Sequence, residues 1–119
     1  MDSLKNQIRG IVWDVDGTLL DTEPLYFECY KLAADKLGHP SYSFDIHKHI
    51  LGRAEAEGAA TVLRMLGETS ITPDEFLELR DTFMLERMPF VGPMPGAAAA
   101  VQSLRGTFPM AVATSAKRA

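Results

Sequence analysis

The sequence predicts an α/β protein in which a small parallel sheet is interrupted by a block of helices. Three observations support this fold class. Residues 8–13, "IRGIVW", form a short apolar segment typical of a buried strand. Residues 22–88 change to the apolar period of helices, and a second apolar segment, "FPMAVA", follows at 108–113. Two strands separated by this much helix are expected to run parallel, with the helices inserted between them.

The first strand is expected to end at Asp14, because the turn-forming letters "DVDGT" follow it. A helix is expected from Thr22 onward, and Gly38 with Pro40 should end it. Its apolar positions share one face: Leu25, Cys29, Leu32, Ala33 and Leu37. Cys29 is therefore expected to be a buried structural thiol.

Three further helices are expected in the inserted block. "SFDIHKHI" predicts a short helix capped by Ser43, with His47 and His49 on its surface. A longer helix over 54–66 should bury Ala56, Ala59, Ala60, Leu63 and Leu66, and should end at Gly67. The letters "TPDE" predict the next helix start, with Thr72 as N-cap, Pro73 in the first turn and Glu75 completing a capping box.

The second part of the core begins with the rigid linker "VGPMPG". A helix from about Ala97 to Leu104 should follow, with Gly106 ending it before the second strand. We therefore expect residues 22–88 to form a four-helix cap. Residues 1–21 and 89–119 should form an incomplete, Rossmann-like α/β core.

Composition limits the possible partners of the chain. Its 119 residues are 46% apolar and 24% charged, with a net charge of -4, which is ordinary for a soluble domain. Negative charge disfavours nucleic acid or an anionic membrane as the main partner, and no apolar run approaches the roughly 20 residues of a membrane span. One cysteine excludes an internal disulfide and the N-terminus lacks a signal-peptide core, so we expect a cytoplasmic protein.

Asp14 and Asp16 are unusual residues for the end of an apolar strand. Carboxylates there are costly unless they are hydrogen-bonded, paired or bound to a cation. From the residues alone three interpretations stay open: an Asx-turn with a helix cap, a passive metal site, or catalysis in which one carboxylate attacks and the other moves a proton. Because close carboxylates repel, Mg²⁺ is an expected companion. The Thr18 hydroxyl is expected to hold the aspartates in place.

The string "IVWDVDGTLLDT" resembles motif I of the haloacid dehalogenase-like hydrolase superfamily, hhhhDxDGT, where h is apolar. The continuation "LLDTEPLY" resembles the branch with a small helical cap, and "PMPGA" at 93–97 is similar to the return from that cap. "MAVATSAKR" at 110–118 resembles motif II. This branch includes sugar-phosphate and nucleotide phosphatases and β-phosphoglucomutases, and the chain most resembles pseudouridine-5'-phosphatase-like enzymes.

The resemblance implies a role for each matching residue. Asp14 would attack phosphorus and form an aspartyl-phosphate, while Asp16 would protonate the leaving oxygen and later activate water. Mg²⁺ would be bound by the Asp14 carboxylate and the Asp16 backbone carbonyl. The Thr114 hydroxyl would steady the transferring phosphoryl group, with the backbone N–H of Ser115 beside it.

The implied function is a Mg²⁺-dependent phosphatase of a small phosphorylated metabolite, such as a sugar or nucleoside phosphate. Glu23 and Arg53 are candidates for contacts between the cap or its hinge and the substrate. Two alternatives stay open: a β-phosphoglucomutase-like phosphoryl transferase, and a non-catalytic binding or assembly fragment. Tyr26 stands where the mutases commonly carry a His, which favours a phosphatase.

The chain departs from the superfamily because it ends soon after the motif II resemblance. Members carry a later Lys and a later acidic motif that completes the Mg²⁺ shell, and neither follows Thr114 here. Two strands also leave apolar sheet faces and edges uncovered. We therefore expect the 119-residue form to be a truncated fragment with impaired activity, or one that covers these surfaces by self-association.

Overall fold

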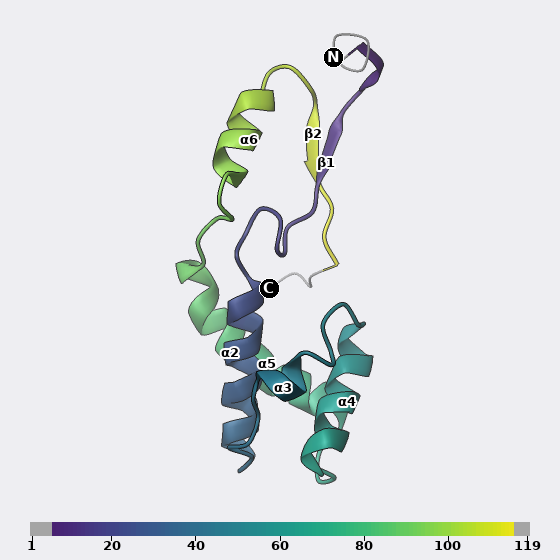
Figure 1. Ribbon diagram of the computed structural model, residues 1–119, viewed down its shortest axis with the longest axis vertical. Coiled ribbons are helices and arrows are strands. Elements are labelled where there is room, and N and C mark those ends of the chain that lie inside the picture. The colour runs from purple at the N-terminus through teal and green to yellow at the C-terminus, as the bar shows by residue number, and fades with distance from the viewer. Residues whose placement is uncertain (1–5, 116–119) are drawn as a thin grey trace. The chain divides into compact units, whose positions relative to one another are not determined.

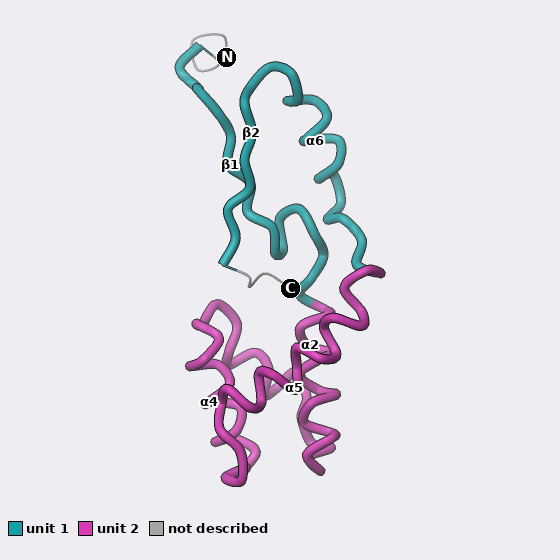
Figure 2. The backbone as a smooth tube through the Cα atoms, turned by 180° about the vertical axis from the view of Figure 1, so that it is seen from behind, with its two compact units in different colours: residues 1–23, 91–119 teal, residues 24–90 magenta. Residues whose placement is uncertain are grey.

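The computed structural model describes residues 6–115, and its elements are labelled in Figure 1. The chain separates into two compact units (Figure 2). The first, which we call the sheet unit, combines residues up to 23 with those from 91 onward. The second, the helical unit, contains residues 24–90. The sheet unit is therefore assembled from two segments that are far apart in the sequence.

Two parallel strands form the sheet, as the sequence predicts (Figure 1). Strand β1 (Ile11–Trp13) pairs with β2 (Met110–Val112), and Trp13 lies opposite Val112. The Ala113 N–H donates to the Trp13 carbonyl at 2.9 Å, which extends the pairing beyond the strand ends. Both strands therefore end at the same edge of the sheet.

Helix α6 (Ala97–Leu104) precedes β2 in the sheet unit, with the bounds expected from the sequence. Gly96 and Gly106 flank it with φ angles of 82° and 85°, a region that glycine enters without a steric penalty. On the sheet, the side chains of Val12 and Val112 are 67% and 58% exposed. Because Val12 pairs with Ala111 and Val112 pairs with Trp13, these two side chains lie on opposite faces of the sheet. Exposed apolar side chains of this kind are consistent with association, which stays a prediction.

The helical unit consists of four helices and one turn of 3-10 helix: α2 (Glu23–Lys36), α3 (Phe44–His47), α4 (Glu55–Leu66), α5 (Pro73–Arg87) and η1 (Met88–Phe90). Its core combines aromatic and small aliphatic side chains: Tyr30, Ala33, Ala34, Tyr42, Ile50, Ala59, Val62, Leu63, Phe76 and Leu77. Because the small residues lie on α2 and α4, these helices can approach large rings closely. None of the helices in the described part of the chain is long and apolar enough to cross a membrane.

The expected helix ends are confirmed at α4 and α5. The Glu75 N–H donates to the Thr72 hydroxyl at 3.1 Å, and the Thr72 N–H donates to the Glu75 carboxylate at 3.2 Å. These two bonds are the predicted capping box. Gly67 ends α4 with a φ of 72°.

The expected surface position of His47 is wrong. This side chain is only 3% exposed and its Nδ1 is hydrogen-bonded to the Tyr42 hydroxyl. It lies among the rings of Phe27 and Tyr30, whose centroids are 5.1 Å and 5.5 Å away. A four-residue helix has too few positions for its apolar period to show which face is buried, so the error arose from its length. His49 is exposed, as expected.

Burial lowers the pKa of His47 below its usual 6.5, because the packed rings disfavour the imidazolium. At His47 the unfolded chain therefore binds a proton more readily than the folded chain. The free energy of unfolding falls for this reason as the pH drops below about 6.5.

A His47→Gln variant keeps an oxygen that can accept a hydrogen bond from the Tyr42 hydroxyl, but its side chain does not titrate. We expect the urea unfolding curves of the wild type and of His47→Gln to converge as the pH is lowered from 7.5 to 5.5. A His49→Gln variant is the matched control, and a gap that does not change with pH would contradict the assignment.

Candidate functional site

A tight backbone turn directly follows β1. The Val15 carbonyl accepts hydrogen bonds from the N–H groups of Thr18, Leu19 and Leu20, at 3.1, 2.9 and 3.0 Å. Gly17 donates to the Leu20 carbonyl at 2.9 Å and has a φ of 73°, in the region that favours glycine. The "DGT" letters thus produce a compact turn that fixes the residues on either side of it.

The carboxylates of Asp14 and Asp16 lie in different surroundings. Asp14 is exposed, and one of its oxygens accepts the Val15 N–H at 2.8 Å. Asp16 is partly buried and accepts the Thr22 hydroxyl at 2.9 Å. Thr22 itself is only 1% exposed, so the Asp16 carboxylate is held by a rigid partner. One carboxylate is therefore accessible to solvent and the other is fixed.

Thr22 is a candidate site residue that the sequence did not predict. We expected the Thr18 hydroxyl to hold the aspartates, but the hydroxyl that binds Asp16 belongs to Thr22. The available signal was the second Asp-Thr pair at positions 21–22, where a buried polar side chain at a helix start needs a partner.

Thr114 and Ser115 follow β2 at the edge where Asp14 follows β1. The register pairs Trp13 with Val112, so the chain positions after each strand continue side by side. Thr114 is two positions beyond the end of β2, and both it and Ser115 are exposed. The remaining residues of the segment that resembles motif II, 116–118, lie outside the described residues.

The segment that resembles the cap return is hydrogen-bonded to the turn after β1. The Met94 N–H donates to the Leu19 carbonyl and the Asp21 N–H donates to the Gly92 carbonyl, both at 2.9 Å. These bonds join two parts of the chain separated by about 70 residues of sequence. The "PMPG" letters therefore help to hold the aspartate-bearing turn in place.

Glu23 also lies against this turn. A Cβ added to Gly17 would be 3.9 Å from a carboxylate oxygen of Glu23. Arg53, the other candidate from the sequence, belongs to the helical unit, where it is exposed and ion-paired with Glu57 at 3.2 Å. Glu23 is therefore beside the turn that carries Asp14 and Asp16, in the same unit, whereas Arg53 belongs to the other unit.

The residues after β1 fit part of a Mg²⁺ shell. The Asp14 carboxylate and the Asp16 backbone carbonyl are oxygen donors of the kind that Mg²⁺ prefers. Within residues 6–115, no three side chains of Asp, Glu, His or Cys are grouped closely enough to hold a metal ion by themselves. Backbone carbonyls, waters and a bound phosphate would have to complete such a shell.

Comparison with known proteins assigns the chain to a family. Residues 8–119 match the haloacid dehalogenase-like hydrolases. The chain belongs to this family. Its small parallel sheet with several helices also matches the fold of solved members. A candidate beta-phosphoglucomutase from Thermotoga maritima superposes with a TM-score of 0.72 at 30% identity, covering 93% of this chain and 51% of that one.

Curated relatives of this chain include proteins that are phosphatases by name. A phosphorylated carbohydrates phosphatase from Thermotoga maritima is 42% identical over 59 residues, which are 50% of this chain and 27% of the relative. A fructose-1-phosphate phosphatase from Escherichia coli is 30% identical over 112 residues, which are 92% of this chain and 57% of the relative. The chain therefore spans between about a quarter and somewhat more than half of the lengths of these relatives.

Proposed function

We propose that the protein hydrolyses phosphate monoesters of small phosphorylated carbohydrates through an aspartyl-phosphate on Asp14. The observation that carries the proposal is the exposed Asp14 carboxylate at the carboxyl edge of a parallel strand pair. Ligands of open α/β sheets bind at that edge. The phosphatase names of the two curated relatives support the substrate class.

The two aspartates suit different steps of this reaction. Asp14 is accessible, so its oxygen that is not bonded to Val15 can attack phosphorus and displace the sugar oxygen. Asp16 is fixed by Thr22, and a fixed carboxyl group can donate a proton to the leaving oxygen and later take one from water. The attack forms one P–O bond and breaks another, and hydrolysis of the aspartyl-phosphate then releases inorganic phosphate and regenerates Asp14.

The remaining site residues would hold the phosphate group. The Thr114 hydroxyl and the Ser115 N–H are donors suited to the equatorial phosphate oxygens. The Asp14 carboxylate and the Asp16 carbonyl would hold Mg²⁺, which when bound supplies positive charge against the repulsion between phosphate and carboxylate. This charge is needed because "DVDGTLLDTE" contains four carboxylates and no Lys or Arg.

The helical unit would act as the cap that selects the leaving group. In this proposal Glu23 lies at the junction with the cap, and Arg53 contacts the substrate from an exposed segment before α4. An Arg is well suited to a phosphate or to sugar hydroxyls, since its planar fork donates several hydrogen bonds. The pairing of Arg53 with Glu57 is surface-exposed, so a ligand can replace it at little cost.

A second candidate activity is isomerisation of a sugar phosphate. The superposition on the candidate beta-phosphoglucomutase favours it, whereas Tyr26, in place of the His common in mutases, favours hydrolysis. The two reactions differ in their products. A phosphatase releases inorganic phosphate, while a mutase forms an isomer and retains the phosphoryl group.

The test is phosphate release by the full-length protein from fructose 1-phosphate, glycerol 3-phosphate and β-glucose 1-phosphate. We expect release from at least one ester with Mg²⁺, loss of at least about 10²-fold in rate after EDTA, and recovery when Mg²⁺ is restored. Isomer formation without free phosphate would favour the mutase. Hydrolysis that EDTA does not change, or no reaction with any ester, would contradict the proposal.

A further inference from the structure

A buried arginine connects three helices of the helical unit. The side chain of Arg80, in the middle of α5, is 4% exposed. Its Nη2 donates to a Glu55 carboxylate oxygen at 3.1 Å, and its Nε donates to the Asp81 carboxylate at 2.9 Å. The guanidinium also lies over the rings of Tyr26 and Tyr30, at 5.5 Å and 5.4 Å from their centroids. Arg80 therefore contacts α2 and the start of α4 as well as its own helix.

Stability alone does not account for a charge at this position. Burying a guanidinium removes it from water, and an apolar side chain of similar volume often serves a core equally well. Arg80 adds a constraint on orientation, because its planar guanidinium must contact Glu55 and two rings at the same time. The contacts thus specify where α4 begins relative to α2 and α5.

The start of α4 has few other anchors. Its N-cap is Ala54, which has no side-chain acceptor for the first N–H groups. Before it, residues 51–54 are exposed, and the Arg53 N–H is held by the Ile50 carbonyl at 3.1 Å. Glu55, bound by Arg80, is the first residue of the helix and follows Arg53 by two positions.

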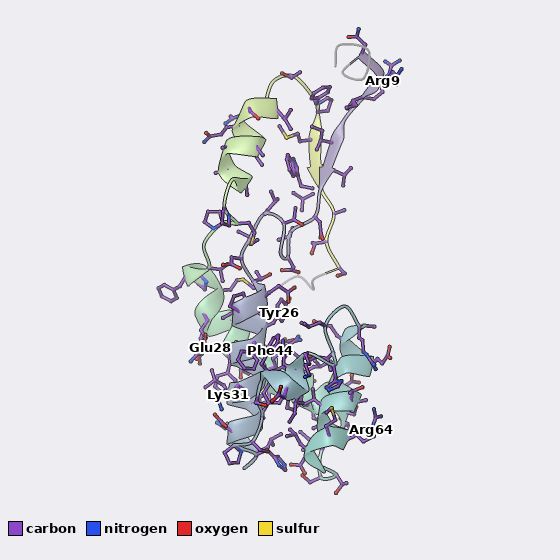
Figure 3. The ribbon with its side chains drawn as sticks, viewed as in Figure 1. Arg9, Tyr26, Glu28, Lys31, Phe44 and Arg64 are labelled. Carbon is purple, nitrogen blue, oxygen red and sulfur yellow. The ribbon has the colours of Figure 1, made fainter. Side chains whose placement is uncertain are left out.

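Tyr26 places the same contact near the beginning of α2. In Figure 1 the first turns of α2 and α4 lie at the same end of the helical unit, and Figure 3 shows Tyr26 in the first part of α2. One guanidinium therefore links the start of α2 to the segment that carries Arg53.

We propose that Arg80 is a positioning residue for substrate selection, which it performs by fixing Glu55 and hence the Arg53 segment, without touching the substrate. The proposal rests on the proposed function, in which Arg53 contacts the sugar phosphate. If the contact between Arg80 and Glu55 is lost, residues 51–54, which include Arg53, sample more conformations and substrate binding weakens. The chemical step, which takes place at Asp14, is unaffected.

The test compares Arg80→Met and Glu55→Gln in the full-length protein with the exposed control Arg64→Met. Glu55→Gln removes the partner charge from a side chain that is 44% exposed, so it perturbs folding little. For both test variants we expect KM for the best sugar phosphate to rise about tenfold while kcat changes less than about twofold. Arg64→Met should resemble the wild type.

A second measurement does not depend on catalysis. Hydrogen exchange of the Arg53 and Gly58 amides, which donate to the Ile50 and Ala54 carbonyls, should quicken about tenfold in Arg80→Met, while exchange at the start of α5 stays unchanged. Exchange that quickens equally throughout the helical unit, or does not change at Arg53 and Gly58, would overturn the positioning role. A wild-type protein that releases no phosphate would instead overturn the proposed function, so the two failures are distinguishable.

Discussion

The Asp14→Asn variant will lose phosphatase turnover by a factor of about 10³ or more. The amide keeps the shape of the carboxylate, and its oxygen can still accept the Val15 N–H that is now 2.8 Å from Asp14. It lacks the negative charge needed for attack on phosphorus, and it is a weak ligand for Mg²⁺. Steady-state phosphate release, measured with the best sugar phosphate, checks the prediction.

The matched control for this variant is Asp21→Asn. Asp21 is an exposed carboxylate in the same segment, and the contact that fixes its backbone is the N–H bond to Gly92. Its replacement removes the same charge, so we expect a rate within about threefold of the wild type. Equal losses in both variants would mean that net charge, and not the nucleophile, determines turnover. Undiminished turnover by Asp14→Asn would refute the assignment.

The second large effect is expected from Asp16→Asn, which removes the proton donor but leaves the nucleophile in place. The amide oxygen can still accept the Thr22 hydroxyl, so the turn should keep its shape. We expect kcat/KM for alkyl and sugar phosphates, which reports departure of the leaving group and not the later attack of water, to fall by about 10²- to 10⁴-fold. For p-nitrophenyl phosphate, whose leaving group departs without a proton, the loss should be at least about tenfold smaller.

The two classes of substrate serve as each other's control in this experiment. Both require attack by Asp14 and both use the same phosphate-binding residues. They differ in the basicity of the leaving oxygen, which determines how much a general acid accelerates its departure. Equal losses of kcat/KM for the two classes in Asp16→Asn would contradict the acid role and would leave Asp16 as a metal ligand or a structural residue.

Features fixed by local chemistry were predictable from the sequence. The Thr72 and Glu75 capping box, the end of α4 at Gly67 and the bounds of α6 each depend on a few neighbouring residues. The parallel pairing of β1 with β2 was predictable as well, because two strands separated by helices are rarely antiparallel neighbours.

Features that depend on contacts between distant elements were not predictable. Arg80 and His47 are polar, so a pattern of apolar residues places them on a surface, but each is buried by partners from other helices. Ala56 illustrates the reverse error: it was expected on the buried side of α4 and is exposed. Thr22 was missed for the same reason, since its bond to Asp16 depends on the path of the turn between them.

The most direct test is to trap the phosphorylated protein. The full-length enzyme would be mixed with its sugar phosphate and Mg²⁺, quenched in acid within one turnover, digested, and analysed by mass spectrometry. We expect an acid-stable, base-labile phosphoryl group on the peptide that contains Asp14, and none in Asp14→Asn. Turnover that proceeds with no phosphorylated peptide, or with the phosphoryl group on another residue, would contradict the central claim.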